Sequence, residues 1–390
     1  MAPLSRSSAL AGLTAAVLLA AGCGGGTGGG EGGEPIKIGV PVPLSGDYAS
    51  AGEDILRGAR LAAQDINQRG GVLGRKIQIA QADDACGAQV GAQAAQRLVS
   101  SGIAAAAGGY CSTAALPELN TFHRSKIPFV MDASTNPQLT EMGFAEAFRT
   151  IGRDDQQGPI AASFIVNDLK AGRAAVLHDN TTYAKGLADA AAKALQQEGA
   201  QVVYNDALTP GQADYTPVLT KISGAKPDVL YFTGYFAEAG LLIKQAKQLG
   251  ADFQMVGGDA TNDPTLIKTA GPAAEGFMLS TAPLAQFLPA AQDYVKSYQQ
   301  AHGAQPGPYS VYEYDAVSVV AEAIEKAGSA EPEKITQALA GIKGFQGLTG
   351  TITFDENGDR SDPVYIIARV EDGKFAGYKD LKDGQWVDFG

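Results

Sequence analysis

At roughly 150 residues per domain, a chain of 390 residues is long enough for two or three domains, each with its own hydrophobic core. Hydrophobic residues make up 45 % of the chain and charged residues 18 %, which excludes a disordered polyelectrolyte because this apolar fraction supports burial. The 42 acidic and 30 basic side chains give a net charge of −12, whereas proteins that bind nucleic acid usually carry the opposite balance. Three histidines leave little material for a metal site, so neither a metal nor a cofactor is expected.

The N-terminus has the pattern of a secretory signal peptide in residues 1–22. Arg6 supplies a positive charge, and residues 9–21 form an apolar stretch of 13 residues, which is too short to span a bilayer. The sequence Leu-Ala-Ala-Gly-Cys that ends at Cys23 resembles a bacterial lipobox, so cleavage before Cys23 and a lipid on its thiol are expected. The alternative is an ordinary signal peptide followed by a chance cysteine. Residues 23–34 are rich in glycine and predict a flexible tether, and no later stretch is apolar enough to span a membrane.

Cys86 and Cys111 are the two other cysteines. In the oxidising compartment that an exported protein reaches, such a pair usually forms a disulfide. Neither a CxxC motif nor a Cys/His cluster accompanies them in the sequence, so a disulfide is favoured over a catalytic cysteine or a two-cysteine metal site. The bridge would close a loop of about 25 residues and stabilise the fold by about 3 kcal/mol.

The first third of the chain alternates between strand and helix patterns. Apolar runs bounded by proline or glycine predict strands at 36–40, 76–82, 103–107 and 127–131. Ser50 and Glu53 match a capping box, which predicts a helix that starts at Ser50 and ends at Gly70-Gly71. Further helices are expected over 89–101 and 113–126.

The same alternation restarts at residue 173. Strands are expected at 173–178, 201–205, 228–233 and 255–257, and helices at 184–198, 216–223 and 234–249. This order predicts parallel sheets in two lobes, each covered by helices on both faces. The last third changes character, with helices at 290–301 and 310–326 and then a strand pair formed by 351–354 and 364–370.

Polar residues follow several of these strands, which is where parallel sheets bind ligands. Ser112 begins a helix whose free N–H groups favour a carboxylate or phosphate, although plain N-capping gives the same pattern. Thr135 follows a strand between small neighbours, which also fits an ordinary polar loop. Asp259 lies beside glycines and suits an ammonium group, or merely a turn.

Five segments, in this order and spacing, resemble the periplasmic leucine/isoleucine/valine-binding proteins, the substrate-binding components of branched-chain amino-acid ABC importers. They are Asp83-Asp84-Ala85-Cys86, Gly109-Tyr110-Cys111-Ser112, Ala133-Ser134-Thr135-Asn136-Pro137, Asp155-Gln156-Gln157-Gly158-Pro159, and His178-Asp179 with Tyr183. The similarity runs from about Ile36 to near the C-terminus. It implies the α/β fold of the type I periplasmic binding proteins, with two lobes, each a doubly wound and mainly parallel sheet, joined by three crossover segments. The implied lobes are residues 35–152 with 284–360, and residues 153–283 with 361–390.

The resemblance also implies how a free amino acid would be held. Ser112 and Thr135 would bind the α-carboxylate, and the carbonyl of Ala133 and the carboxylate of Asp259 would accept the α-ammonium. This agrees with the chemistry of a zwitterion, which needs hydrogen-bond donors at one end and acceptors at the other in a dry cleft.

Four tyrosines would surround the rest of the ligand, according to the same resemblance. Tyr183 and Tyr235 would cover it from the second lobe, while Tyr110 and Tyr309 match positions near its side chain. The disulfide would fix the strand end that presents the carboxylate site.

Two positions depart from the family pattern. Ala51 stands where the branched-chain members usually carry an aromatic residue, so the pocket is roomier unless Tyr48 or Tyr110 fills it. Asp259 replaces a glutamate and is one methylene shorter, so the ammonium must lie closer or bind through a water molecule. These departures allow a ligand side chain that differs from those of leucine, isoleucine and valine.

Other motifs lead to no function. Residues 355–359 resemble the start of a calcium loop but lack its later ligands, so a hairpin turn around Asn357-Gly358 is expected. The chain has no GxxxxGK[ST] motif and thus no P-loop. Ser112 and His123 lie about 16 Å apart along one predicted helix, too far for a catalytic dyad.

These features predict a monomeric, lipid-anchored binding protein outside the cytoplasm, and not an enzyme. It would capture a branched-chain or related amino acid, close around it and deliver it to an ABC permease and its ATPase. One alternative is a sensor that reports amides, short-chain acids or amino acids to a signalling partner. Another is an exported hydrolase that uses Ser112 or a reduced cysteine.

Overall fold

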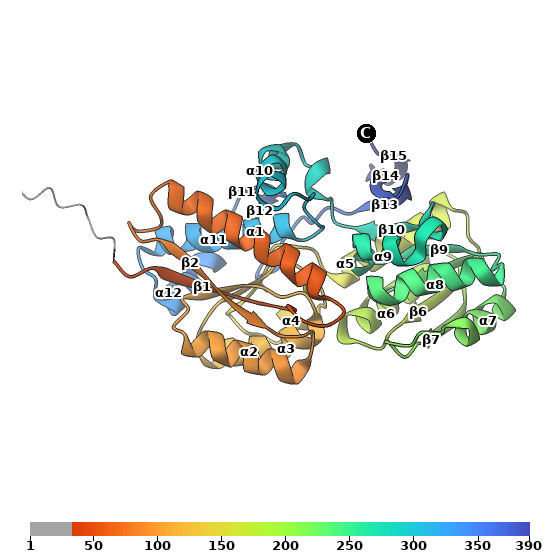
Figure 1. Ribbon diagram of the computed structural model, residues 1–390, viewed down its shortest axis with the longest axis horizontal. Coiled ribbons are helices and arrows are strands. Elements are labelled where there is room, and N and C mark those ends of the chain that lie inside the picture. The colour runs from red at the N-terminus through yellow and green to blue at the C-terminus, as the bar shows by residue number, and fades with distance from the viewer. Residues whose placement is uncertain (1–32) are drawn as a thin grey trace, which may run out of the picture.

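The computed structural model describes residues 33–390, and their elements form two groups around separate sheets (Figure 1). The expected signal peptide, Cys23 and most of the expected tether lie outside these residues. In Figure 1 the first group, red to orange, and the second group, green, lie at opposite ends of the molecule, and the blue C-terminal third contributes to both. This architecture confirms the predicted α/β fold with two lobes.

The first sheet has five parallel strands in the order β2-β1-β3-β4-β5. The strands are β1 (Ile36–Val42), β2 (Ile77–Asp83), β3 (Ala105–Gly108), β4 (Phe129–Met131) and β5 (Ala147–Arg149). The helices of this group are α1 (Ala49–Gln68), α2 (Ala88–Ser100), α3 (Ser112–Arg124), α4 (Gln138–Glu141), α10 (Gln292–His302), α11 (Ser310–Ala327) and α12 (Pro332–Ala340). A short hairpin, β11 (Phe345–Gly347) and β12 (Gly350–Ile352), follows them.

Helices cover both faces of the first sheet. Helices α1 and α11 lie on one face, and α2 and α3 lie on the other (Figure 1). Ala105 and Ala107 belong to the hydrophobic cluster on the first face and Ala106 to the cluster on the second, because successive side chains of a strand point to opposite sides. An uninterrupted apolar run is therefore what a strand buried on both faces requires.

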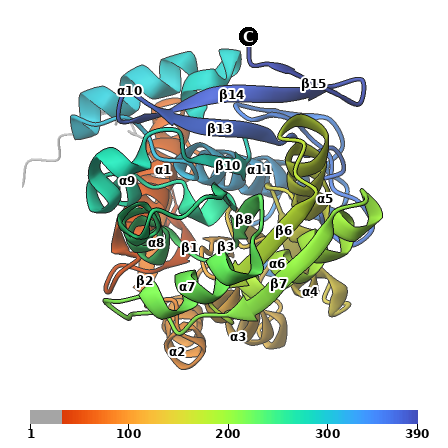
Figure 2. The ribbon, with the colours of Figure 1, turned by 90° about the vertical axis from the view of Figure 1, so that its right-hand side faces the viewer.

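The second sheet has eight strands in the order β15-β14-β13-β10-β9-β8-β6-β7. Its parallel part contains β6 (Arg173–His178), β7 (Gln201–Ala207), β8 (Val229–Phe232), β9 (Gln254–Gly257) and β10 (Met278–Thr281). Its antiparallel part contains β13 (Ile366–Glu371), β14 (Lys374–Lys382) and β15 (Gln385–Asp388), at the top of Figure 2. The helices are α5 (Asp154–Ser163), α6 (Thr182–Gln197), α7 (Thr216–Ala225), α8 (Phe236–Leu249) and α9 (Pro264–Ala270). No helix within residues 33–390 is both long and apolar enough to cross a membrane.

The chain passes between the two groups three times, as predicted. The first passage follows β5, the second joins β10 to α10, and the third joins β12 to β13. Near the passages, Asn136 after β4 donates a hydrogen bond to the carbonyl of Thr182, the first residue of α6, so segments that follow strands of both sheets contact each other there.

The predicted pairing of the last two strand segments is wrong. Residues 351–354 and 364–370 do not pair with each other, because β12 pairs with β11, and β13 inserts beside β10. The apolar side chains of Ile366, Ile367 and Ala368 are buried in the second group. A sequence pattern predicts such a strand but does not reveal which other strand it will pair with. The turn around Asn357-Gly358 is present, flanked by a bridge between Phe354 and Arg360.

The prediction of a capping box at Ser50 is also wrong. Helix α1 starts one residue earlier, at Ala49, and its N-cap is Tyr48, whose side chain makes no capping hydrogen bond. Ser50 lies inside the first turn, and its hydroxyl donates a hydrogen bond of 3.0 Å to Asp263 of the second group. The residue that the sequence marked as a helix cap instead joins the two groups.

Candidate functional site

The eight residues expected at the site lie just after strands or at the first turns of helices, and none is more than 5 % exposed. The first group supplies four residues after β3 and β4 and one just before α11: Tyr110, Ser112, Ala133, Thr135 and Tyr309. The second group supplies one residue from α6, one after β8 and one after β9: Tyr183, Tyr235 and Asp259.

Asp259 connects the two groups. Its carboxylate accepts a hydrogen bond of 2.7 Å from the hydroxyl of Tyr183 and one of 3.1 Å from the hydroxyl of Tyr309. Tyr183 lies in α6, whereas Tyr309 precedes α11, which packs on the first sheet. Burial raises the pKa of Asp259, and hydrogen bonds, first that of Tyr183, lower it in part. Asp259 is therefore a buried acceptor that two phenols orient from opposite sides.

Five tyrosine rings pack together beside this carboxylate. The ring centroid of Tyr110 lies 5.4 Å from that of Tyr309 and 5.6 Å from that of Tyr235. Tyr183 lies 5.3 Å from Tyr235. Tyr48 lies 4.6 Å from Tyr235 and 6.4 Å from Tyr110. The four expected tyrosines are thus brought together, and Tyr48 joins them from the start of α1.

Ser112 and Thr135 come together through Asn136. The hydroxyl oxygen of Ser112 accepts a hydrogen bond of 3.3 Å from the N–H of Asn136, and the side-chain amide of Asn136 donates one of 2.8 Å to the carbonyl of Thr182 in α6. The N-cap of α3 is Cys111, so the plain N-capping alternative for Ser112 does not apply. Thr135 Oγ1 is buried without a hydrogen-bond partner in residues 33–390.

Two further buried polar residues lie here and were not expected from the sequence. Asp154 begins α5, Gln157 lies one turn later, and both are completely buried. The N–H of Asp154 donates a hydrogen bond of 3.0 Å to the carbonyl of Thr135, and the side chain of Gln157 lies close enough to Asp259 to lower its pKa. An acidic residue in a first helical turn is typical of any helix, so no sequence signal distinguished Asp154.

Arg149 holds the loop that carries Thr135. Its guanidinium pairs with Asp359 at 2.8 Å and donates hydrogen bonds to the carbonyls of Ser134 and Asn136 at 3.0 and 3.1 Å. The remaining nitrogen donates to Thr140. Since every nitrogen of this buried side chain already donates to a protein acceptor, the guanidinium positions the loop.

Cys86 and Cys111 form the expected disulfide, with their Cα atoms 5.2 Å apart. Because Cys111 directly precedes Ser112, the bridge ties the end of β3 to the loop after β2. The pairing excludes a thiol nucleophile or a two-cysteine metal site made by these residues. Across residues 33–390 there is no cluster of three side chains that would ligate a metal.

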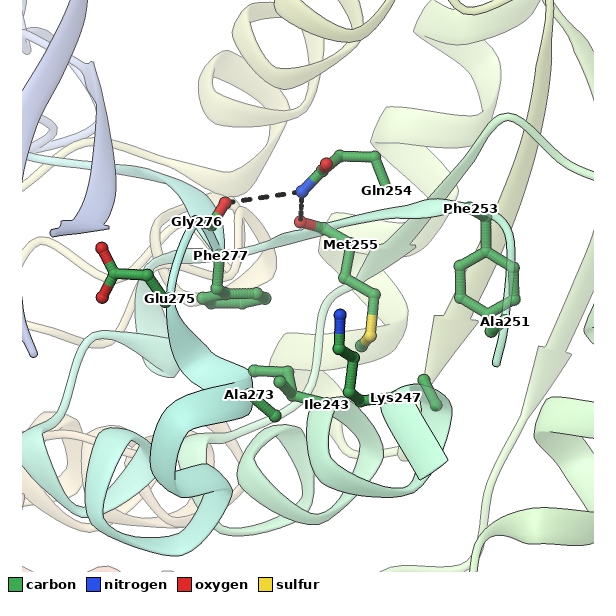
Figure 3. A pocket seen from close by; sticks show the side chains of 11 residues that line it. Ile243, Lys247, Ala251, Phe253, Gln254, Met255, Ala273, Glu275, Gly276 and Phe277 are labelled. Atoms are coloured by element: carbon green, nitrogen blue, oxygen red, sulfur yellow. Dashed lines mark hydrogen bonds between the residues drawn. The ribbon is translucent and has the colours of Figure 1, made fainter. Parts of the chain in front are cut away.

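A separate hollow lies in the second group, away from this site (Figure 3). Its volume is about 190 Å³, and its walls come from α8, β9 and the segment before β10. Ile243, Met255 and Phe277 line it, together with the charged ends of Lys247 and Glu275. None of the eight expected residues lines this hollow, so it is not the candidate site.

The chain is similar to known binding proteins over most of its length. Residues 35–374 match a family described as periplasmic binding protein. An amino acid binding protein of Pseudomonas aeruginosa is 36 % identical over 344 residues, which cover 87 % of this chain and 91 % of the relative. A Leu/Ile/Val-binding protein homolog of Brucella suis is 33 % identical over 343 residues, which cover 87 % of this chain and 92 % of that protein.

Solved structures show the same similarity in space. The leucine binding protein LivK of Thermotoga maritima superposes with a TM-score of 0.83 at 29 % identity, covering 88 % of this chain and 97 % of that chain. The branched-chain amino acid substrate binding protein LivJ of Streptococcus pneumoniae, solved in complex with isoleucine, gives 0.82 at 26 % identity, covering 91 % and 99 %.

Proposed function

The chain belongs to the periplasmic binding protein family, and from this premise we propose that it captures a free amino acid of branched-chain type, or a relative, between its two lobes. It delivers this ligand to an ABC permease and its ATPase and catalyses no reaction. The observation that carries the proposal is the buried carboxylate of Asp259, which Tyr183 and Tyr309 orient from both groups. A cationic ammonium group is the ligand chemistry that such an acceptor stabilises.

The proposed contacts separate the two charged ends of the ligand. Ser112 and Thr135 hold the α-carboxylate with hydroxyl and backbone donors, and the unpartnered Oγ1 of Thr135 supports this role. The carbonyl of Ala133 and the carboxylate of Asp259 accept hydrogen bonds from the α-ammonium. This polarity requires a ligand that carries both charges.

The tyrosines form the remaining walls in this proposal. Tyr183 and Tyr235 cover the ligand, and Tyr110 and Tyr309 lie near its side chain. Tyr48 precedes the small Ala51 by three residues and packs on Tyr235 at 4.6 Å, which supports Tyr48 as the aromatic residue that the family pattern places at position 51.

We propose that residues 35–152 with 284–360, and residues 153–283 with 361–390, are the two lobes that close on the ligand. Contacts between the two groups support this mechanism, since the hydroxyl of Thr113 accepts the N–H of Thr182 at 3.2 Å. Each contact made only in the closed form adds to the free energy of closure, which the ligand completes.

The absence of catalysis is supported by the surroundings of Ser112. Its hydroxyl oxygen accepts the N–H of Asn136. His123, the histidine on the same helix, lies with Nδ1 2.6 Å from Glu146 Oε2 and stacks on Phe144. A serine nucleophile needs a base within hydrogen-bond reach, and His123 is engaged elsewhere.

Calorimetric titration of the mature protein with the twenty amino acids tests the proposed ligand class. At least one, with leucine, isoleucine and valine tried first, is expected to bind with micromolar or tighter affinity. 4-Methylpentanoate, which is leucine without its ammonium group, is the matched control and should bind far more weakly. The absence of a measurable heat of binding with all twenty amino acids would reject the proposal.

We propose that Cys23 carries the lipid that anchors the protein outside the cytoplasm. Its position at the end of a lipobox-like sequence supports this. Cys23→Ala should move the protein from the membrane fraction to the soluble fraction of cells that process lipoproteins, and should abolish labelling by a radioactive fatty acid. Equal labelling of the two proteins would contradict the assignment.

A further inference from the structure

Asp154 carries a completely buried carboxyl group that the proposed contacts leave unused. Neither of its oxygens has a hydrogen-bond partner in the part of the chain that the structure describes. A buried charge without a partner is strongly disfavoured, so such a group either keeps a proton or binds a cation.

Three observations place this carboxyl group at the candidate site. The N–H of Asp154 donates to the carbonyl of Thr135 at 3.0 Å. Gln157, one turn later on α5, lies beside Asp259. A Cβ atom built on Gly186 of α6 would lie 3.5 Å from Asp154 Oδ2. Asp154 therefore lies between the loop of Thr135 and α6, with its carboxyl group against Gly186 and close enough to Asp259 to be affected by its charge.

The groups that face Asp154 are mainly acidic or phenolic. Burial raises the pKa of Asp154, and the charges of Asp259 and Asp155 raise it further. The hydroxyl of Thr135 lies close enough to lower this pKa in part without forming a hydrogen bond. The guanidinium of Arg149 also lowers it only in part, since Arg149 already pairs with Asp359. The phenols whose ionisation its charge opposes come from α6, β8 and two loops: Tyr183, Tyr231, Tyr235 and Tyr365.

We propose that Asp154 and Asp259 together hold the ammonium group of the ligand, and that binding displaces a proton from Asp154. This inference rests on the proposed function. In the free protein the Asp154 carboxyl group keeps its proton because no cation compensates the charge. When the ammonium enters, the O–H bond of Asp154 breaks, the proton passes to the solvent, and the carboxylate accepts hydrogen bonds from the ligand. The pair thereby selects ligands that carry an ammonium group over simple carboxylic acids.

Calorimetry with L-leucine, or with the tightest amino acid of the panel, tests the inference. Titrations in phosphate and in imidazole at pH 6, 7 and 8 count the protons released, because both buffers work over this range and differ in ionisation enthalpy. The wild type should release up to about one proton per ligand, and its affinity should rise by as much as tenfold per pH unit. Asp154→Asn should release none, bind at least tenfold more weakly at pH 8, and discriminate less against 4-methylpentanoate.

Asp155→Asn is the matched control, because Asp155 is the next residue, pairs with Arg153 and has a side chain that is 47 % exposed. It should release the same proton as the wild type. If Asp154→Asn still releases the proton, the inference is wrong while the proposed function stands. If no amino acid binds the wild type, both the inference and the proposed function are wrong.

Circular dichroism checks that Asp154→Asn folds. If it does not, infrared difference spectra of the wild type decide the matter. Loss of a protonated-carboxyl band on addition of the amino acid supports the inference, and an unchanged band overturns it.

Discussion

At the scale of single residues, the candidate site consists of buried hydrogen-bond acceptors and phenols, and burial strengthens the hydrogen bonds between them. A hydrogen bond to a charged group gains strength where water is excluded, and Asp259 is only 3 % exposed. Its two phenol partners, Tyr183 and Tyr309, come from different groups. The orientation of this one carboxylate therefore depends on the positions of both groups.

Asp259→Ala is expected to weaken amino-acid binding at least tenfold, or about 1.4 kcal/mol, because the ammonium loses a charged acceptor in a dry site. Calorimetry with the tightest amino acid measures the change. Asp252→Ala, at an exposed aspartate seven residues earlier, should bind like the wild type. Unchanged binding by Asp259→Ala would remove this residue from the site.

Residue identity predicted Asp259 but not Asp154. Asp259 follows a predicted strand and lies beside glycines, which marks a ligand-binding loop. Asp154 begins a helix, where an acidic side chain usually needs no other explanation than the helix dipole. Its importance depends on Thr135 and Gly186, which approach it only in the folded chain.

At the scale of elements, the end of β2 and helix α3 share a buried pair of carboxyl groups. Asp84 accepts the N–H of Cys86 at 2.7 Å, and Glu118 on α3 is completely buried. Burial raises the pKa of Asp84 to about 7, and burial together with the charge of Asp84 raises the pKa of Glu118 well above its usual range. The pair therefore retains a proton near neutral pH, beside the disulfide.

Asp84→Asn should remove part of the pH dependence of stability. Because the pKa of Asp84 is higher in the folded than in the unfolded state, its contribution is fully present below the unfolded pKa and is lost as the pH rises through about 7. Between roughly pH 4 and pH 7 the free energy of unfolding of the wild type should fall relative to that of the variant, by at most about 1.4 kcal/mol per pH unit.

Urea unfolding at several pH values measures this difference. A difference that stays constant with pH would show that Asp84 titrates normally. Asp293→Asn is the control, since the side chain of Asp293 is 96 % exposed and should leave the pH profile unchanged.

At the scale of the whole molecule, the proposed function depends on the contact between the two groups. Ser50 with Asp263, Asn136 with Thr182, and Tyr309 with Asp259 each join residues of different groups. Such contacts form and break together if the lobes move as rigid bodies, which couples ligand binding to the surface that a permease would recognise.

Gly186→Ala tests this closure. A Cβ atom at this position would lie 2.5 Å from Nδ2 of Asn136, so the variant should hinder the approach of α6 and weaken amino-acid binding by about 1 kcal/mol. Stability should not fall, because alanine favours a helix. Gly224→Ala, also in a helix but with no atom within 4 Å of the added Cβ, is the matched control. Calorimetry and thermal unfolding measure both effects, and equal affinities would contradict the role assigned to Gly186.

The sequence by itself determined the alternation of strands and helices, the pairing of Cys86 with Cys111 and the strand ends that carry polar residues, because these depend on local periodicity and on a small number of cysteines. Only the tertiary structure decided that β13 lies beside β10, that Ser50 reaches Asp263 and that Asp154 lies next to the site. These neighbours are remote along the chain, and a buried polar group or strand edge finds its partner only when the whole chain has packed.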